Sequence, residues 1–254
     1  MTTLDLTVIT CTSDRPEAFR LCAIWMLRQD FPGTIQWVVV EDSREKYAEP
    51  LLSSELAHET GGAFFDLAIL GRKPQPNGVA SFRGNLIAGI ERAESERICF
   101  VEDDDHYKPQ WLSLCFNELH DVDAFGETAA RYYHVRSRHY QRFLASGHAS
   151  LGQTAVRRHL ALWLRKWVSK NGDSFHGDFA MWRQAARHHK AKLLPKSGHV
   201  TSMKGLPGKP NLGVGARLSR NGKLDAGGSV LRKWVGEADA KLYGQFHERP
   251  AVPD

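Results

Sequence analysis

Apolar strand-like runs and helical patterns alternate through the first hundred residues, and this alternation constrains the fold more than any other feature. The helical patterns lie at 16–28, directly after the turn residues Ser13 to Pro16, and at 78–93. The strand-like runs are LTVITC (6–11), IQWVVVED (35–42), FFDLAIL (64–70) and RICFVE (97–102). Strands that alternate with helices predict an α/β fold with a mostly parallel, Rossmann-like central sheet and flanking helices.

Composition fits a single globular domain. The 254 residues, of which 42% are hydrophobic, can bury one substantial core. The sequence has no apolar run long enough to span a membrane and no signal-peptide pattern at its start, so we expect a soluble cytoplasmic protein. Its four cysteines lack metal-binding spacing and are expected to be buried free thiols: Cys11, Cys22, Cys99 and Cys115.

Acidic residues follow two of the predicted strands, with Asp42 after the second and Glu102–Asp105 after the fourth. Because ligands bind at the carboxyl ends of parallel strands, the two acidic sites should converge on one crevice. Four consecutive carboxylates repel one another unless a cation neutralises them, and hard oxygen ligands select Mg²⁺ or Mn²⁺. The alternative is a solvated acidic turn that caps a helix beginning near Pro109.

Several short motifs follow one another in a specific order over roughly residues 4–120. They are T-x-S-D-R-P-E-A-F, which runs from Thr10 or Thr12 to Phe19, V-V-V-E-D-S (38–43), A-S-F-R-G-N (80–85) and F-V-E-D-D-D-H-Y-K-P-Q-W-L (100–112). Each match is weak alone, but in this order and spacing they resemble the family 2 glycosyltransferases of the GT-A fold. The resemblance implies a metal-dependent transfer of a sugar from a nucleotide-sugar, most simply a UDP-sugar, to an acceptor hydroxyl.

The resemblance also assigns roles to residues. Asp104 is the implied metal ligand, because Glu102 stands where the family has the first Asp of its D-x-D motif. Asp42 falls at the carboxylate that binds the nucleotide base. The residues implied in binding the donor are Thr10, Arg15, Asp42, Arg83, Asn85, Glu102 and Asp103.

The remaining chemical roles fall in the second half of the chain. The step His176-Gly177-Asp178 precedes a helical pattern and is similar to the family's G-E-D or E-D step, which implies that Asp178 is the catalytic base of an inverting transfer. Asp178 would also suit a helix N-cap, and Asp173 is the reserve candidate. His199 lies where related GT-A enzymes supply a histidine to the metal or diphosphate, although lone histidines are often structural.

The expected boundaries follow from these motifs. Residues 1–203 should form one GT-A domain, with a donor half at 1–127 and an acceptor half at 128–203. Residues 204–254 should form a C-terminal loop-helix extension that packs on this domain. Gly, Pro and cations in 204–223 predict a flexible loop that could close over a diphosphate with Lys204 or Lys209, or serve as a linker. Residues 228–243 are expected to form a helix that packs back on the domain.

Charge is distributed unevenly along the chain. Residues 1–127 hold 11 basic and 22 acidic residues, whereas residues 128–254 hold 23 and 7. Residues 128–172 contain no acid, but nine Lys or Arg interleaved with large aromatic residues. Such a segment suits a polyanion, although the arginines could equally form a solvated face or offset the acidic half.

This basic segment guides the choice of acceptor. Residues 154–170 form an amphipathic helical pattern with cations on its polar side. We expect the acceptor to be a hydroxymethylated base in phage-type DNA, reached by base flipping. The alternative is a lipid-linked or surface-glycan acceptor at an anionic membrane. The residues expected to contact the acceptor are Arg157, Arg158, Arg165 and Lys166.

Two functions of other classes also fit parts of the sequence. The acidic cluster could serve a metal-dependent nuclease or phosphoesterase, although no second acidic or histidine group has two-metal spacing. A nucleic-acid-binding module with a decayed transferase fold would explain the basic half, but it leaves the intact acidic cluster without a role.

Overall fold

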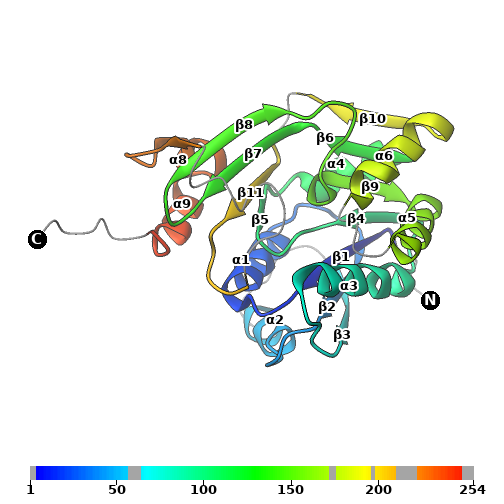
Figure 1. The fold of residues 1–254 in the computed structure, drawn as a ribbon, viewed down its shortest axis with the longest axis horizontal. Helices are drawn as coiled ribbons and strands as arrows, with labels where there is room; N and C mark the ends of the chain where they lie inside the picture. The colour runs from blue at the N-terminus through cyan, green and yellow to red at the C-terminus, as the bar shows by residue number, and fades with distance from the viewer. Residues whose placement is uncertain (1–3, 57–63, 172–175, 196–197, 210–221, 248–254) are drawn as a thin grey trace, which may run out of the picture.

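The computed structural model describes residues 4–56, 64–171, 176–195, 198–209 and 222–247. In this part of the chain two β-sheets pack with helices into a layered α/β structure (Figure 1). This confirms the predicted fold class. None of its helices combines the length and apolar character needed to cross a membrane.

The first half forms the predicted strand-helix repeat. Its elements are β1 (Leu6–Thr12), α1 (Pro16–Leu27), β2 (Thr34–Glu41), α2 (Ala48–Leu56), β3 (Phe64–Gly71), α3 (Gly78–Arg92) and β4 (Arg97–Phe100). Strand β1 lies between β4 and β2, and β3 pairs with the outer side of β2, with all three pairings parallel. The carboxyl ends of these strands therefore meet at one edge of the sheet.

Three strands from the second half extend this sheet to the order β10-β6-β9-β4-β1-β2-β3. They are β6 (Ala124–Glu127), β9 (Thr154–Arg157) and β10 (Ala191–Leu194). Strand β9 runs antiparallel to both of its neighbours, β4 and β6, whereas β10 is parallel to β6. The sheet is thus mostly parallel, with one reversed strand.

A second sheet has the order β12-β8-β7-β11-β5. It consists of β5 (Asp105–Tyr107), β7 (Ala129–His134), β8 (His139–Leu144), β11 (Val200–Lys204) and β12 (Lys223–Leu224). Strand β5 comes directly after the acidic turn that ends β4, and it pairs antiparallel with β11 so that Asp105 faces Ser202. This pairing brings a strand from late in the chain against the acidic cluster.

The helices cover both faces of the central sheet. One face carries α3, α5 (Arg158–Lys170) and α6 (Gly177–His188), whose apolar sides form one core with residues such as Ile9, Leu164 and Trp182. The other face carries α1, α2, α4 (Trp111–Glu118), α8 (Ser229–Val235) and α9 (Glu237–Gly244). Trp25 of α1 packs there on Tyr243 of α9, so the C-terminal helices belong to the core.

Two local predictions need correction. The pattern over 154–170 is not one helix, because Thr154–Arg157 form β9 between β4 and β6, and α5 begins at Arg158. The predicted helix over 228–243 is two helices separated at Gly236, where φ is 95°. Glycine adopts this left-handed region without the steric cost that a side chain would carry.

The predicted loop over 204–223 falls mostly on residues 210–221, which lie outside the described residues.

Of the cysteines, Cys22, Cys99 and Cys115 are buried and Cys11 is half-buried, and all four are free thiols.

Candidate active site

A pocket of about 440 Å³ opens at the carboxyl ends of β1 and β4. Its walls come from both sheets and from the helices α3, α5 and α6. Seven of the residues to which the resemblance gave donor, metal or base roles line it together: Arg15, Arg83, Asn85, Glu102, Asp103, Asp104 and Asp178. Segments that are far apart in the chain thus converge on one cavity, as the strand order requires.

The acidic turn is held by side chains from three directions. The Thr12 hydroxyl donates a hydrogen bond of 2.7 Å to Asp103, which also forms an ion pair with Arg15. Lys204 Nζ lies 2.9 Å from Asp104 and 3.5 Å from Asp105. The cation that the four carboxylates need is therefore supplied partly by the chain itself, through two basic residues.

Burial and charge oppose each other in this cluster. Burial raises the pKa of Glu102 to about 7. Burial alone would lower the pKa of Lys204, but the neighbouring Asp104, Asp105 and Glu102 carboxylates raise it above its ordinary range. Lys204 is thus a fixed positive charge at neutral pH, and it ends a strand, whereas we predicted that it would lie in a mobile loop.

The same carboxylates can accommodate a divalent cation. One oxygen each from Glu102, Asp104 and Asp105 lies within 4.8 Å of the others. Asp105 Oδ1 is buried and accepts no hydrogen bond among the described residues, so it retains lone pairs for a ligand. An all-oxygen set suits Mg²⁺ or Mn²⁺. Any ion that binds there must share the carboxylates with Lys204.

Some of the predicted donor-binding residues line the pocket, whereas others are buried behind it. Asn85 lines the pocket, and its amide donates a hydrogen bond of 3.0 Å to Asp42, which is buried directly behind it. Asp42 Oδ2 accepts no hydrogen bond among the described residues. Thr10 is fully buried and accepts a hydrogen bond from the Trp37 indole, so of the two threonines in the first motif it is Thr12 that reaches the pocket.

Asp178 lies on the wall of the pocket formed by α6. The helix begins at Gly177 with His176 in the N-cap position, so Asp178 is in the first turn and does not cap the helix. Its Oδ1 accepts a hydrogen bond of 2.7 Å from the backbone N–H of Phe179. Burial raises the pKa of Asp178. The reserve candidate, Asp173, lies outside the described residues.

His199 is not brought to the acidic cluster. Its Nδ1 lies 2.5 Å from the buried carboxylate of Glu127, and its ring stacks on Trp111. It does not line the pocket, and it does not belong to the carboxylate group that could hold a metal. These contacts give His199 a structural role, because they tie the start of β11 to the central sheet.

Aromatic side chains form the outer part of the pocket. Tyr132 and Phe143 stack with their ring centroids 5.5 Å apart and an interplanar angle of 8°. His148 meets Phe179 edge to face at 5.4 Å. The sequence offered only a general aromatic content in this segment, and the strand pairing that aligns these rings was not predictable from it.

The four basic residues expected at the acceptor do not line the pocket. Arg157 and Arg158 donate hydrogen bonds to the backbone carbonyl groups of His120 and Ala93, and Arg165 pairs with Glu91. Lys166 is exposed on α5. Helix α5 packs against α3 and α6, so its apolar side is covered by protein.

Comparisons with known proteins bear on the fold. No family model matches the chain, and no curated protein matches it. Solved structures match over most of its length. S. aureus TarS superposes with a TM-score of 0.56 and 15% sequence identity, covering 78% of this chain and 36% of TarS.

The first 349 residues of TarS, in complex with UDP, give a TM-score of 0.55 at 14% identity over 78% of this chain and 60% of that one. The mannosyltransferase PcManGT from Pyrobaculum calidifontis, in complex with GDP-Man and Mn²⁺, gives 0.54 at 13% identity over 81% of this chain and 58% of the other. This chain therefore spans 36 to 60% of the length of these structures. At these identities the likeness concerns the fold, and the chain has the GT-A fold of nucleotide-sugar glycosyltransferases.

Proposed function

We propose that this protein transfers a sugar from a nucleotide-sugar to an acceptor hydroxyl. One observation carries the proposal: a single pocket in a GT-A fold combines the acidic turn with a second carboxylate, Asp178, on the opposing α6 wall. A nuclease or phosphoesterase would need the acidic turn but not this separate carboxylate. A pure binding module would need neither.

The donor half of the pocket supplies the groups that a nucleoside diphosphate requires. Asn85 lines the pocket and is held by Asp42, which is fully buried behind it, so the predicted contact of Asp42 with the base would require Asn85 to move aside. Lys209 lines the pocket, with its ammonium group 3.0 Å from the Ser13 hydroxyl, where it can meet a phosphate. A UDP-sugar is the simplest donor, in keeping with the UDP complex of TarS.

The carboxylates of Glu102, Asp104 and Asp105 would hold Mn²⁺ or Mg²⁺. The ion would stabilise the negative charge that grows on the departing diphosphate. Arg15 keeps Asp103 and Asp104 in position, because it forms ion pairs with both. Lys204 offsets the remaining charge of the cluster.

Asp178 acts as the catalytic base in this proposal. It takes the proton from the acceptor hydroxyl while the hydroxyl oxygen attacks the anomeric carbon and the diphosphate leaves on the opposite side. A single displacement of this kind inverts the anomeric configuration. The raised pKa of Asp178 improves its ability to take up a proton, provided that the carboxyl is ionised at the working pH.

For the acceptor, we propose a hydroxymethylated base in DNA. The proposal is supported by the acid-free basic segment at 128–172 and by the aromatic rings that line the outer pocket, on which a flipped base could stack. The intramolecular contacts of Arg157, Arg158 and Arg165 weigh against a large contribution from these three residues. A sugar ring could use the same aromatic surface, so a glycan acceptor is the comparison to test.

Donor binding provides the first test. We expect UDP to bind more tightly with Mn²⁺ than without it, as measured by isothermal titration calorimetry. Replacing Asp104 by Asn should weaken the Mn²⁺-dependent binding by at least about 10-fold, because a carboxylate of the cluster is lost. The thermal unfolding midpoint of the variant shows whether it is folded.

If the affinity for UDP changes neither with Mn²⁺ nor with the Asp104 substitution, the proposed metal site is contradicted. Tight binding of nucleic acid without any binding of UDP would instead support the binding-module alternative. Hydrolysis of a phosphodiester that is lost with Asp104→Asn would support the phosphoesterase.

Salt dependence tests the acceptor. Removing one cation that binds a DNA phosphate should lower the slope of log affinity against log salt by about one unit. Because Arg157, Arg158 and Arg165 are held by intramolecular contacts, changing them together to Gln should lower that slope by less than the roughly three units that three phosphate contacts would give, and should leave UDP binding unchanged.

A matched triple variant changes the exposed Arg28, Arg44 and Arg92 to Gln in the acidic half. It controls for the loss of net charge and should keep the full slope. Weak, salt-insensitive binding of hydroxymethylated DNA by the wild-type protein would exclude the DNA acceptor. Transfer to a lipid or polysaccharide fraction would then point to the glycan.

A further inference from the structure

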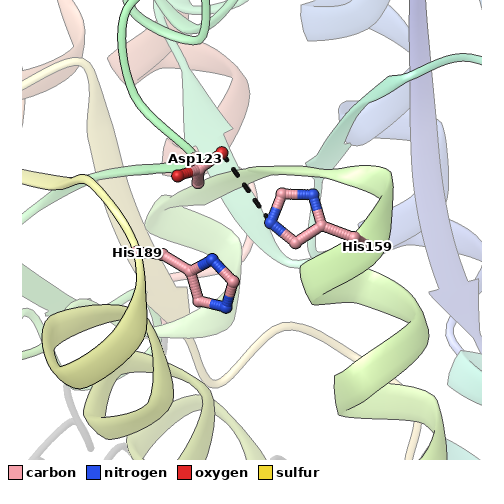
Figure 2. A group of neighbouring side chains, drawn as sticks. All are labelled: Asp123, His159 and His189. Atoms are coloured by element: carbon pink, nitrogen blue, oxygen red, sulfur yellow. Dashed lines mark ion pairs between the residues drawn. The ribbon is translucent and has the colours of Figure 1, made fainter.

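A second group of side chains that could bind a metal lies at the other ends of the central strands, away from the active-site pocket. Asp123 immediately precedes β6, His159 is in the first turn of α5, and His189 links α6 to β10 (Figure 2). The active-site pocket lies at the carboxyl end of β4, whereas Arg157 at the end of the antiparallel β9 pairs with Arg97 at the start of β4. The two sites therefore lie at opposite ends of strand β4.

The backbone brings these three residues together. The Asp123 carbonyl accepts a hydrogen bond of 2.8 Å from the Arg157 N–H, and the Asp123 N–H donates one of 2.8 Å to the Lys190 carbonyl. Asp123 Oδ2 also accepts a hydrogen bond of 3.0 Å from the Lys190 N–H. Asp123 is thus bonded to Arg157 and Lys190. His159 follows Arg157 by two residues, and His189 directly precedes Lys190.

The side chains already converge. His159 Nε2 lies 3.7 Å from Asp123 Oδ1, and the two imidazole rings have centroids 4.8 Å apart. One ligand atom from each of the three residues lies within 4.8 Å of the others. Figure 2 shows the rings near the aspartate, with His159 on α5 and His189 on the segment that follows α6. Among the described residues, neither imidazole makes a hydrogen bond within 3.5 Å.

The group is open to solvent. His159 is exposed, while Asp123 and His189 are half-buried. All three border a broad surface depression of about 740 Å³, which His120 and His188 also line. An ion from solution can therefore reach the three ligand atoms without any rearrangement of the core.

We propose that Asp123, His159 and His189 bind a divalent transition metal of the Zn²⁺ class, with water completing the coordination. Two imidazoles and a carboxylate favour such ions over Mg²⁺, whereas the all-oxygen cluster at Glu102 favours Mg²⁺ or Mn²⁺. Tetrahedral zinc holds its ligand atoms about 3.3 Å apart, given bonds of about 2.0 Å. The ligand atoms would therefore have to move closer together, and the exposed His159 side chain is free of tight packing that would oppose its rotation.

The bound ion would stabilise the fold at a distance from the chemistry. It would join the start of β6, the first turn of α5 and the segment between α6 and β10, which are far apart in the chain. An ion that binds the folded chain more tightly than the unfolded chain shifts the equilibrium toward the folded state. Helices α5 and α6 both contribute to the wall of the active-site pocket, so the ion would also support that wall.

Three cations border the same depression, namely Arg157, Arg187 and Lys190. They would suit an anion, so phosphate is the competing ligand that an experiment must include. The two ligands predict different dependences on the histidines, because only a metal needs their neutral ring nitrogens as electron-pair donors.

The test uses the full chain without a histidine tag, stripped with a chelator and kept in excess Mg²⁺ to occupy the acidic cluster. Zn²⁺ is added, and thermal unfolding and isothermal titration are recorded. At free zinc about 100 times its Kd, the unfolding midpoint should rise by about 5–10 °C. Co²⁺ in place of zinc should give the visible absorption of a nitrogen-ligated site.

Changing His159 and His189 together to Ala should abolish the zinc-induced shift and the cobalt spectrum. The matched control changes His120 and His188 to Ala, two residues that border the same depression outside the ligand group, and should keep both. Asp123→Asn provides a third variant, because Asn can still accept the hydrogen bond from Lys190 but is a poorer metal ligand. A shift that survives the His159/His189 change, or one produced by phosphate and not by zinc, would overturn the proposal.

Discussion

Replacing Asp178 by Asn is expected to lower the turnover number of sugar transfer by about 10² or more, with little change in donor affinity. Asn keeps an oxygen that can accept the hydrogen bond from the Phe179 N–H, so the first turn of α6 is preserved. What is lost is the proton acceptor. Steady-state transfer rates, with UDP affinity from calorimetry, separate the two effects.

The pH profile gives a second measure of the same residue. Asp178 accepts a proton only when it is ionised, so turnover should fall as the pH falls through its pKa. Because burial raises that pKa, the acid limb should lie above the range of an ordinary aspartate, whose pKa is about 3.9. The Asp178→Asn variant should lack this limb. If the Asp178→Asn variant keeps near wild-type turnover and Asp173→Asn loses it, Asp173 is the base instead.

The fold was predictable where local pattern and tertiary context agree. β1, α1, β2 and α3 lie where their sequence patterns placed them, because the two strands are continuous apolar runs that are buried on both faces and the two helices bury their apolar sides. The pattern failed at Thr154–Arg157, where a helical reading continued into residues that the sheet takes up as β9. Hydrophobic periodicity in a short segment does not distinguish a buried strand from the first turn of a helix.

The pocket was predictable to the extent that its residues follow strand ends. Arg15 and Glu102 meet because parallel strands present their carboxyl ends at one edge. Lys204 could not be placed in the same way, because its position depends on the pairing of β11 with β5, two strands about a hundred residues apart. The contact between His199 and Glu127 depends on the same long-range register.

The His159 and His189 pair shows a related limit. His159 is in α5 and His189 is in the link between α6 and β10, and no short spacing in the sequence marks them as metal ligands. The packing of α5 against α6 and the backbone contacts of Asp123 bring them together. Metal sites built from residues that are distant in the chain need the tertiary structure to be recognised.

Replacing Lys204 by Met is expected to lower the free energy of unfolding by about 3–5 kcal/mol when divalent ions are chelated. The substitution keeps the aliphatic stem and removes a buried ammonium that lies 2.9 Å from Asp104 and 3.5 Å from Asp105. The carboxylates would then be left with Arg15 as their remaining paired cation among the described residues. Denaturant unfolding in EDTA measures the loss, and Lys209→Met, at a half-buried lysine bonded to Ser13, is the matched control.

The same variant tests whether Lys204 and a metal ion compete for the acidic cluster. Mn²⁺ should stabilise Lys204→Met more than the wild-type protein, because the ion enters among the same carboxylates without displacing an ammonium group. Adding Asp104→Asn to Lys204→Met should cost less than the sum of the single changes, since both changes remove the same ion pair between Lys204 and Asp104. If Lys204→Met costs no more than Lys209→Met in EDTA and gains nothing from Mn²⁺, the lysine does not offset the charge of the cluster. The metal would then have to supply more of the positive charge that neutralises these carboxylates.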